Sequence, residues 1–277
     1  MLVKLLSIFA LGASTAFVSA TPSSTPRALD LNPPTSVLEN SNYNPIPQLT
    51  ARGLTNAKRL AAGLPLKPPT RRTRTHVSRS QPSGVPPASG SSGNGGGYLE
   101  ARDSDGKCLG FVSKVQNAFG EYVVQDQKED SDLRLRVSFD MNAEGVTDIQ
   151  TTNGPDTDLP YLGGVKGFAS DSTNIEEGSP NYIYIAGTVQ TSPNEPASDG
   201  SNTFTQVTSI AAQIESAIWS YNADTSVIAP QWINEDSGSP TTYVAIADGV
   251  IVLTGDKTEL AEQLGPVDWV SLYYVPA

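Results

Sequence analysis

The side chains best suited to ligand chemistry fall between positions 219 and 236. Five residues there combine flat aromatic rings with amide and carboxyl groups: Trp219, Tyr221, Trp232, Asn234 and Asp236. Sugars stack on aromatic faces while amide and carboxyl oxygens hold their hydroxyl groups. The pattern predicts a glycan-binding patch. The alternative is that the same rings fill the core, where aromatic residues bury a large area. These two alternatives also apply to Trp269, Tyr273 and Tyr274.

Histidine and cysteine are almost absent, which excludes several classes of site. His76 is the only histidine and Cys108 the only cysteine. Residues 98–277 therefore cannot contain a Ser-His-Asp or Cys-His catalytic site, a His-ligated metal or a thiolate cluster. No nucleophile elbow, phosphate loop or dinucleotide motif occurs. A single cysteine cannot form an internal disulfide, so stability must come from an ordinary core in which Cys108 is a small hydrophobic residue.

Carboxylate chemistry survives these exclusions. A glycoside hydrolase needs two carboxyl groups across a cleft, and residues 98–277 contain 27 acidic side chains. Asp236-Ser-Gly238 matches one aspartic-protease loop, but those enzymes need two such loops and this sequence has one. We interpret this motif as a turn, and the balance favours a protein without enzymatic activity.

Two acidic pairs could bind calcium. Asp103 with Asp105, and Asp156 with Asp158, each place two carboxylates two positions apart in a predicted loop, and Ca²⁺ prefers oxygen ligands. Neither pair belongs to a full twelve-residue calcium loop. We therefore expect turn capping or surface acidity, and no required cofactor.

These side chains must be positioned by strands. Alternation is clearest over residues 133–139, and Asp248-Gly249 between two apolar runs predicts a hairpin over residues 242–254. We expect further strands at 98–102, 109–113, 121–125, 182–186, 203–207, 217–221 and 269–274. One short helix should follow Asp256-Lys-Thr-Glu259, which resembles a capping box. Residues 209–218 fit either a helix or a strand.

Many short strands separated by turns predict an all-β fold. We expect residues 98–277 to form a single β-sandwich with one short helix. A β-trefoil-like barrel is the alternative, although no internal repeat is sharp enough to indicate threefold symmetry.

The chain divides into segments of opposite charge. Residues 21–97 are rich in Pro, Ser, Thr and Gly and hold nine Lys or Arg against two Asp or Glu. This composition predicts a disordered basic arm. Residues 98–277 hold eight basic and 27 acidic residues, so this acidic domain carries a net charge of −19. That charge argues against a nucleic-acid partner.

The first 20 residues predict a secretory signal peptide. Lys4 precedes an apolar run that is too short to span a bilayer, and Val18-Ser19-Ala20 is a cleavage pattern. We expect a secreted protein without a membrane span. Within the arm, Lys58-Arg59 and Arg71-Arg72 predict cleavage by a kexin-type endoprotease, which would make the arm a pro-segment.

One stretch of the arm resembles a known group of proteins. Residues 55–72 read Thr-Asn-Ala-Lys-Arg-Leu-Ala-Ala-Gly-Leu-Pro-Leu-Lys-Pro-Pro-Thr-Arg-Arg. This stretch resembles a segment of uncharacterised secreted proteins of mushroom-forming (basidiomycete) fungi, with the pattern Thr-Asn-Ala-x-Arg-Leu-x-x-Gly-Leu-Pro. Residues 215–234 resemble the same group more loosely. The resemblance implies secretion and a fungal origin, and it supplies no catalytic residue.

Together these patterns predict a secreted, non-catalytic extracellular protein that binds cell-wall polysaccharide or another glycan. One alternative is a structural or interaction protein, effector-like in its role, with another extracellular protein as partner. The other is a carboxylate-based glycoside hydrolase.

Overall fold

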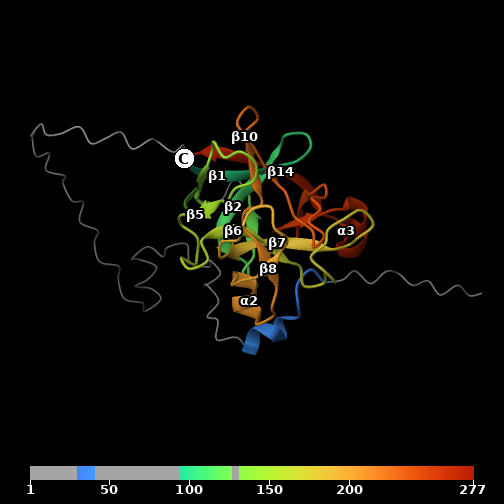
Figure 1. The fold of residues 1–277 in the computed structure, drawn as a ribbon. Coiled ribbons are helices and arrows are strands. Elements are labelled where there is room, and N and C mark those ends of the chain that lie inside the picture. The colour runs from blue at the N-terminus through green and yellow to red at the C-terminus, as the bar shows by residue number, and fades with distance from the viewer. Residues whose placement is uncertain (1–29, 41–93, 127–130) are drawn as a thin grey trace, which may run out of the picture.

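The computed structural model describes residues 30–40, 94–126 and 131–277 (Figure 1). The predicted signal peptide with its cleavage site after Ala20 lies outside the described residues. The same holds for the two dibasic pairs that end in Arg59 and Arg72. The predictions of cleavage at these three positions therefore stay predictions.

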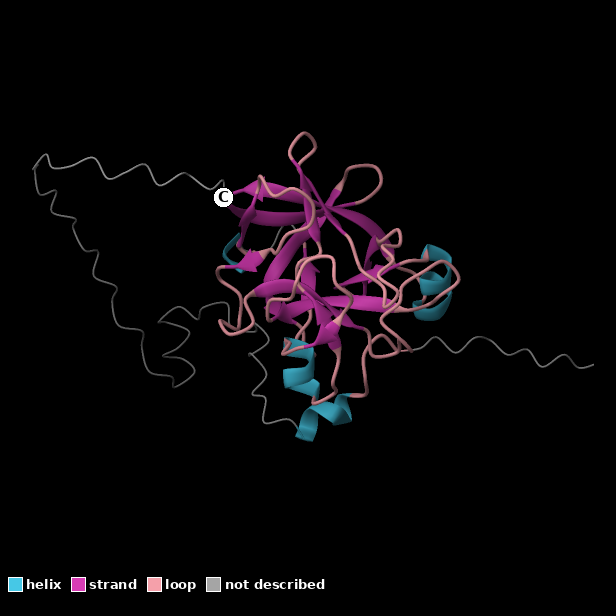
Figure 2. Ribbon diagram, in the orientation of Figure 1, coloured by secondary structure: helices cyan, strands magenta, loops and turns pink. Residues whose placement is uncertain are grey.

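Strands dominate the described part of the chain, and short helices lie at its periphery (Figure 2). The strands are β1 (Asn94–Arg102), β2 (Cys108–Gln116), β3 (Tyr122–Gln125), β4 (Val137–Asp140), β5 (Gln150–Thr151), β6 (Tyr161–Lys166), β7 (Tyr182–Thr188), β8 (Ser198–Asp199), β9 (Gln213–Glu215), β10 (Trp219–Asn222), β11 (Val227–Pro230), β12 (Tyr243–Ala247), β13 (Val250–Thr254) and β14 (Asp268–Pro276). The helices are the 3₁₀ segments η1 (Thr35–Asn40) and η2 (Ser131–Leu133) and the α-helices α2 (Thr203–Thr208) and α3 (Lys257–Leu264).

The strands form one sheet that closes into an eight-stranded antiparallel barrel. The ring runs β1–β4–β5–β6–β7–β13–β12–β14 and returns to β1 through the pairing of Gly97–Arg102 with Ser271–Pro276. The all-β prediction is confirmed. The two separate layers of a sandwich are not observed, because β1 and β13 each pair with different strands along their two halves. This double pairing joins what would otherwise be two layers.

Strand β7 is buried on both faces, and so are its neighbours. All seven residues of β7 are buried. Ile183 and Ile185 face an interior cluster that contains Trp219 and Trp232. The residues that alternate with them face a second, outer cluster, which α2, α3 and the N-terminal segment cover: Tyr182, Tyr184 and Ala186 on β7, with Phe204, Leu260 and Leu31 above them. Continuous burial explains why β7 lacks the apolar–polar alternation of a surface strand.

Turn and cap chemistry confirms two predicted elements. Asp248 and Gly249 both adopt positive φ, at 50° and 82°, and connect β12 to β13. Helix α3 begins after Asp256, whose carboxylate accepts hydrogen bonds from the backbone N–H groups of Thr258 and Glu259.

No helix in the described residues has the length and hydrophobicity of a membrane span.

Three predicted elements differ from the structure. Residues 203–207 belong to helix α2, because the Asn202 side chain accepts a hydrogen bond from the Thr205 N–H and caps that helix. The strand predicted over residues 133–139 starts only at Val137, as β4, and Leu133 belongs to η2. Strand β1 begins at Asn94, inside the predicted linker. Glycine is required there, since a Cβ on Gly97 would lie 2.3 Å from the Val275 carbonyl oxygen.

Gly164 on β6 supplies a test of the packing inside the barrel. A Cβ built on Gly164 would lie 2.5 Å from the Trp232 ring, whereas one built on Gly96 meets nothing within 4 Å. We expect Gly164→Ala to lower the free energy of unfolding by roughly 1–3 kcal/mol, because overpacking strains a filled core. Urea denaturation measures this, with Gly96→Ala as the matched control. Equal midpoints for the two variants would contradict the packing described.

Candidate functional site

The two tryptophans of the predicted glycan-binding patch lie in the interior of the barrel. Trp219 and Trp232 both have an exposed fraction of 0%. The Trp219 indole N–H donates to the Leu162 carbonyl oxygen at 2.5 Å, and that of Trp232 donates to the Thr173 carbonyl oxygen at 2.8 Å. Their polar atoms are thus satisfied inside the fold, and neither ring offers a face to a ligand. This placement matches the core-filling alternative.

The other three residues of the predicted patch also have structural partners. Tyr221 is partly buried, with its ring centroid 5.3 Å from that of Phe139. The buried Asn234 accepts a hydrogen bond from the Ile175 N–H at 3.0 Å and donates to the Ile175 carbonyl at 3.2 Å. Asp236 is exposed and accepts from the Gly238 N–H at 2.8 Å, which is turn chemistry. The five residues do not come together as a surface site.

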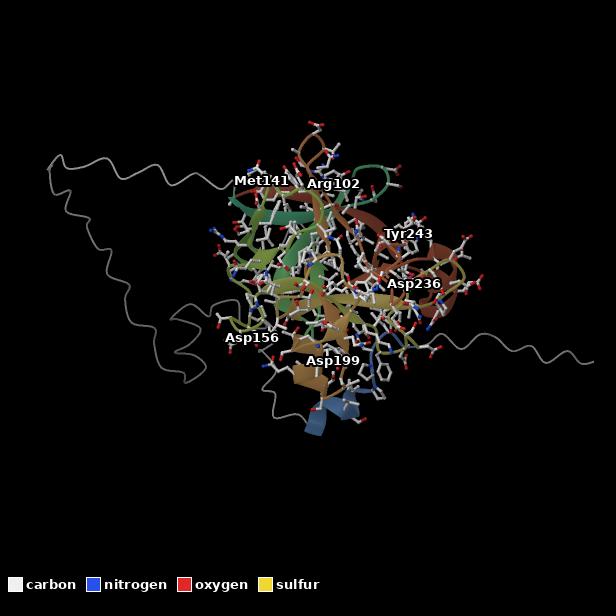
Figure 3. All side chains as sticks on the ribbon, in the orientation of Figure 1. Arg102, Met141, Asp156, Asp199, Asp236 and Tyr243 are labelled. Carbon is white, nitrogen blue, oxygen red and sulfur yellow. The ribbon has the colours of Figure 1, made fainter. Side chains whose placement is uncertain are left out.

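A surface groove lies on the side of the barrel that carries α3, where Figure 3 labels Tyr243. Two adjoining pockets, of about 230 and 550 Å³, share Tyr243 and Lys257 in their linings. Trp269 on β14 lines the smaller pocket. The Lys257 Nζ lies 4.6 Å from the Tyr243 ring centroid and 5.1 Å from that of Trp269. We call this feature the aromatic groove.

Polar side chains line the larger pocket of the aromatic groove. Glu176 and Glu177 are exposed and contribute carboxylates, and Thr241 and Thr258 contribute hydroxyl groups. Asp256 caps α3 and also accepts a hydrogen bond from the Gly178 N–H at 2.8 Å, which lowers the pKa of its carboxyl group. The groove thus combines two half-buried aromatic rings with hydrogen-bond donors and acceptors.

Glu121 and Glu215 are the two most deeply buried glutamates of the described residues. Glu215 on β9 has a pKa raised to about 9 by burial, and its Oε2 accepts one hydrogen bond, from the Ile233 N–H at 3.3 Å. Burial also raises the pKa of Glu121 to about 7, although the Asn117 amide at 2.6 Å and the Asn32 amide oppose this shift. Each glutamate has one buried carboxyl oxygen without a hydrogen-bond partner.

Neither buried glutamate lines the aromatic groove. A general acid needs a raised pKa and also hydrogen-bond reach of a substrate. Glu121 and Glu215 have exposed fractions of 0% and 3%, so they lack that reach in the structure described. Their raised pKa values affect how the stability of the folded protein depends on pH.

The predicted calcium pairs act as turn caps. The Asp103 carboxylate accepts from the backbone N–H groups of Asp105 and Lys107, and Asp156 accepts from the Asp158 N–H at 2.8 Å. Within the described ranges, no three Asp, Glu, His or Cys side chains come together as a metal site. One carboxylate of each predicted pair, that of Asp103 and that of Asp156, thus accepts hydrogen bonds from the backbone of its own turn.

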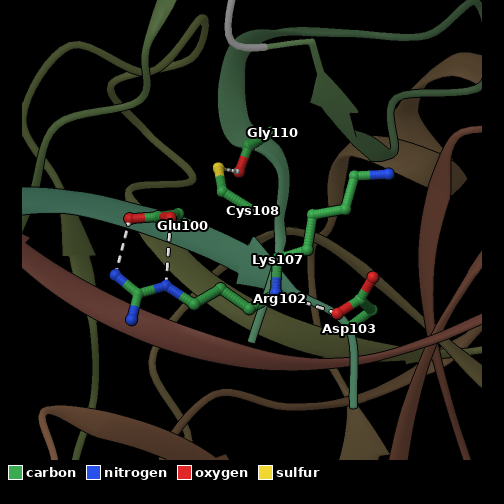
Figure 4. A network of polar contacts seen from close by, with 6 residues as sticks. All are labelled: Glu100, Arg102, Asp103, Lys107, Cys108 and Gly110. Atoms are coloured by element: carbon green, nitrogen blue, oxygen red, sulfur yellow. Dashed lines mark hydrogen bonds and ion pairs between the residues drawn. The ribbon is translucent and has the colours of Figure 1, made fainter. Parts of the chain in front are cut away.

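A network of polar contacts lies where β1 ends and β2 begins, around Arg102 and Cys108 (Figure 4). Arg102 donates two hydrogen bonds of 3.0 Å to Glu100, which lower the pKa of that carboxyl group. The Arg102 guanidinium also lies 4.3 Å from the Tyr273 ring centroid. The Cys108 thiol is free of disulfides, partly buried, and 3.8 Å from the Gly110 carbonyl oxygen. This network joins β1, β2 and β14.

No family model, curated protein or solved structure matches the chain. Of the three groups that form the aromatic groove, the sequence analysis named Trp269 and missed Tyr243 and Lys257. Tyr243 lies at the start of the predicted hairpin and Lys257 at the start of the predicted helix. The sequence pattern therefore explains both residues by secondary structure and does not indicate a site. Their proximity depends on the pairing of β12 with β14. No local signal in the sequence reports that pairing.

The buried glutamates predict a protein that is more stable in acid. A raised pKa means that the folded state keeps a proton which the unfolded chain releases above about pH 4.5. The stabilisation is full below that pH, and for Glu215 it is lost as the pH rises toward about 9. We expect thermal stability to decline between pH 5 and pH 8. Glu215→Gln should reduce the slope by up to about 1.4 kcal/mol per pH unit.

Thermal unfolding measured across this pH range tests the prediction. Glu195→Gln is the matched control, because Glu195 is exposed to solvent. The control should retain the wild-type slope. A Glu215→Gln variant with an unchanged slope would show that Glu215 does not hold its proton in the folded protein.

Proposed function

We propose that the protein is a secreted, non-catalytic extracellular protein that binds glycan in the aromatic groove. The observation that carries this proposal is the placement of the half-buried rings of Tyr243 and Trp269 around Lys257 in two adjoining pockets. Aromatic faces and a few convergent polar groups are the usual components of a small-molecule site. The proposal keeps the ligand class predicted from the sequence and changes the residues that contact it.

Lys257 is the exposed component of the proposed site. Its four-carbon stem rotates freely, and its ammonium group contacts the rings only through weak cation–π attraction at the surface. A sugar ring can displace the ammonium group from the aromatic faces, and the displaced group can donate to sugar hydroxyls. Glu176, Glu177 and Thr241 lie in the adjoining pocket and offer further partners.

Secretion and the extracellular partner belong to the same proposal. The predicted signal peptide supports export, and a net charge of −19 over residues 98–277 disfavours nucleic acid as a partner. Cell-wall polysaccharide is therefore the glycan source that we propose. Glu121 and Glu215, whose pKa values are raised, lie in the interior, so neither is placed to act as the general acid of a carboxylate-based hydrolase in the groove.

Binding to insoluble chitin and β-glucan tests the proposed function. We expect Tyr243→Ala with Trp269→Ala to weaken binding by about tenfold or more, because each ring supplies stacking area. Phe168→Ala is the matched control, since Phe168 is exposed and lies outside the two pockets. The control should bind like the wild-type protein.

Two further measurements separate the alternatives. Trp269→Phe keeps an aromatic ring and should retain most of the binding, which distinguishes lost stacking from lost folding. Release of soluble sugar from either polysaccharide would point to the hydrolase. Binding of the wild-type protein to neither polysaccharide would contradict the proposal and favour a structural or interaction protein.

A further inference from the structure

A segment near the N-terminus packs in the outer hydrophobic cluster, whose other residues come much later in the sequence. We call residues 30–38 the N-terminal strap. The Leu31 side chain has an exposed fraction of 6% and packs in the cluster that contains Tyr182, Tyr184 and Phe204. Burying a leucine side chain stabilises a contact by about 1.5–3 kcal/mol. The strap is therefore held by its own apolar anchor.

Two tyrosine hydroxyl groups fix the backbone of the strap. The Leu31 carbonyl oxygen accepts hydrogen bonds from the Tyr182 hydroxyl at 2.7 Å and from the Tyr184 hydroxyl at 2.5 Å. Each hydroxyl oxygen in turn accepts a backbone N–H at 3.2 Å, from Ala169 and Phe168 respectively. The two hydroxyl oxygens lie 3.4 Å apart, so if the strap leaves one hydroxyl group can donate to the other, but the second is left without an acceptor. An unpaired buried donor is costly.

The side chain after Leu31 makes a third polar contact. The Asn32 amide donates to Oε2 of the buried Glu121 at 3.1 Å. Pro33 is buried beside it, and the strap continues into η1, which lies against α2 (Figure 1). Three consecutive residues thus contact the barrel through two buried apolar side chains, one backbone carbonyl and one side-chain amide. This is the pattern of a short peptide in a specific site.

The strap does not take part in the strand ladder that the structure describes. The hydrogen bonds of Leu31 and Asn32 described above are made with residues that follow β1 in the sequence: Glu121, Tyr182 and Tyr184. Both dibasic pairs lie between residue 40 and β1, at positions 58–59 and 71–72, whereas the predicted signal-peptide cut precedes the strap. Cleavage at either pair would separate the strap from the barrel covalently and leave its contacts intact.

We propose that the barrel contains a peptide-binding site, formed by Tyr182, Tyr184 and Glu121, whose ligand is the Leu31-Asn32-Pro33 segment of this chain. The site stays occupied after cleavage at either dibasic pair. The processed protein is then a non-covalent complex of two chains, and the N-terminal fragment is a subunit of it.

Native cleavage of the protein that begins at Thr21 tests this proposal. A kexin-type endoprotease is applied, and the folded product is separated by size exclusion and identified by intact mass. We expect the N-terminal and C-terminal fragments in one peak. If the dibasic pairs resist cleavage, a specific protease site that replaces Lys58-Arg59 gives the same two fragments. A folded barrel that elutes without the N-terminal fragment would overturn the proposal.

Two strap variants show whether the described contacts hold the fragment. Leu31→Asp places a charge in the apolar cluster, and we expect the cleaved fragment to dissociate at least about 30-fold more readily than the wild-type fragment. Ser36→Asp is the matched control, because Ser36 lies in the strap but is exposed. The control fragment should stay bound. Release of both variant fragments, or of neither, would contradict the assigned site.

Discussion

Burial of β7 on both faces is the constraint on which the rest of the structure depends. A strand with apolar side chains on both faces needs other residues to pack on each face. On one face of β7, Trp219 and Trp232 pack inside the closed barrel. On the other face, α2, α3 and Leu31 cover the strand. The hydroxyl groups of Tyr182 and Tyr184 are buried on this second face and need hydrogen-bond acceptors there. The Leu31 carbonyl supplies one acceptor for both. The strap is thus part of the core, although composition assigns it to the arm.

The elements that depend on neighbouring residues could be predicted from the sequence. Asp248-Gly249 specifies its turn, and Asp256 specifies the start of α3, because the interacting groups lie within a few positions of each other. Closure of the barrel could not be predicted, since it depends on β1 pairing with β14 about 170 positions away. The glycines before Tyr98 were misassigned for a related reason. They have the composition of a linker, but Gly97 leaves room for the Val275 carbonyl of that distant strand.

The candidate site shows the same division between local and distant information. Aromatic residues that are close in the sequence are expected to be close in space. Their residue types do not show whether they lie in the core or on the surface. Trp219 on β10 and Trp232, which follows β11, both pack in the interior cluster with Ile183 and Ile185 of β7. Trp269 and Tyr243 lie next to Lys257 on the outside of the barrel. Tyr243 is on β12 and Trp269 is on β14, and these two strands pair. Lys257 is the first residue of α3, which lies between those strands in the sequence. The ligand class rests on residue types and stays a prediction, whereas the location of the groove required the topology.

The order of synthesis gives the strap a role in timing. A chain emerges from the ribosome N-terminus first, so Leu31 is made long before the tyrosines that bind its carbonyl, 151 and 153 positions later. During that interval the strap has no site. Docking must wait until β7 is present with the partners that complete its outer face, including β13. Docking closes a long loop, whose entropy cost comes before the contacts of the strap form. A docked strap therefore marks a chain in which β7 and the elements that complete its outer face are already assembled.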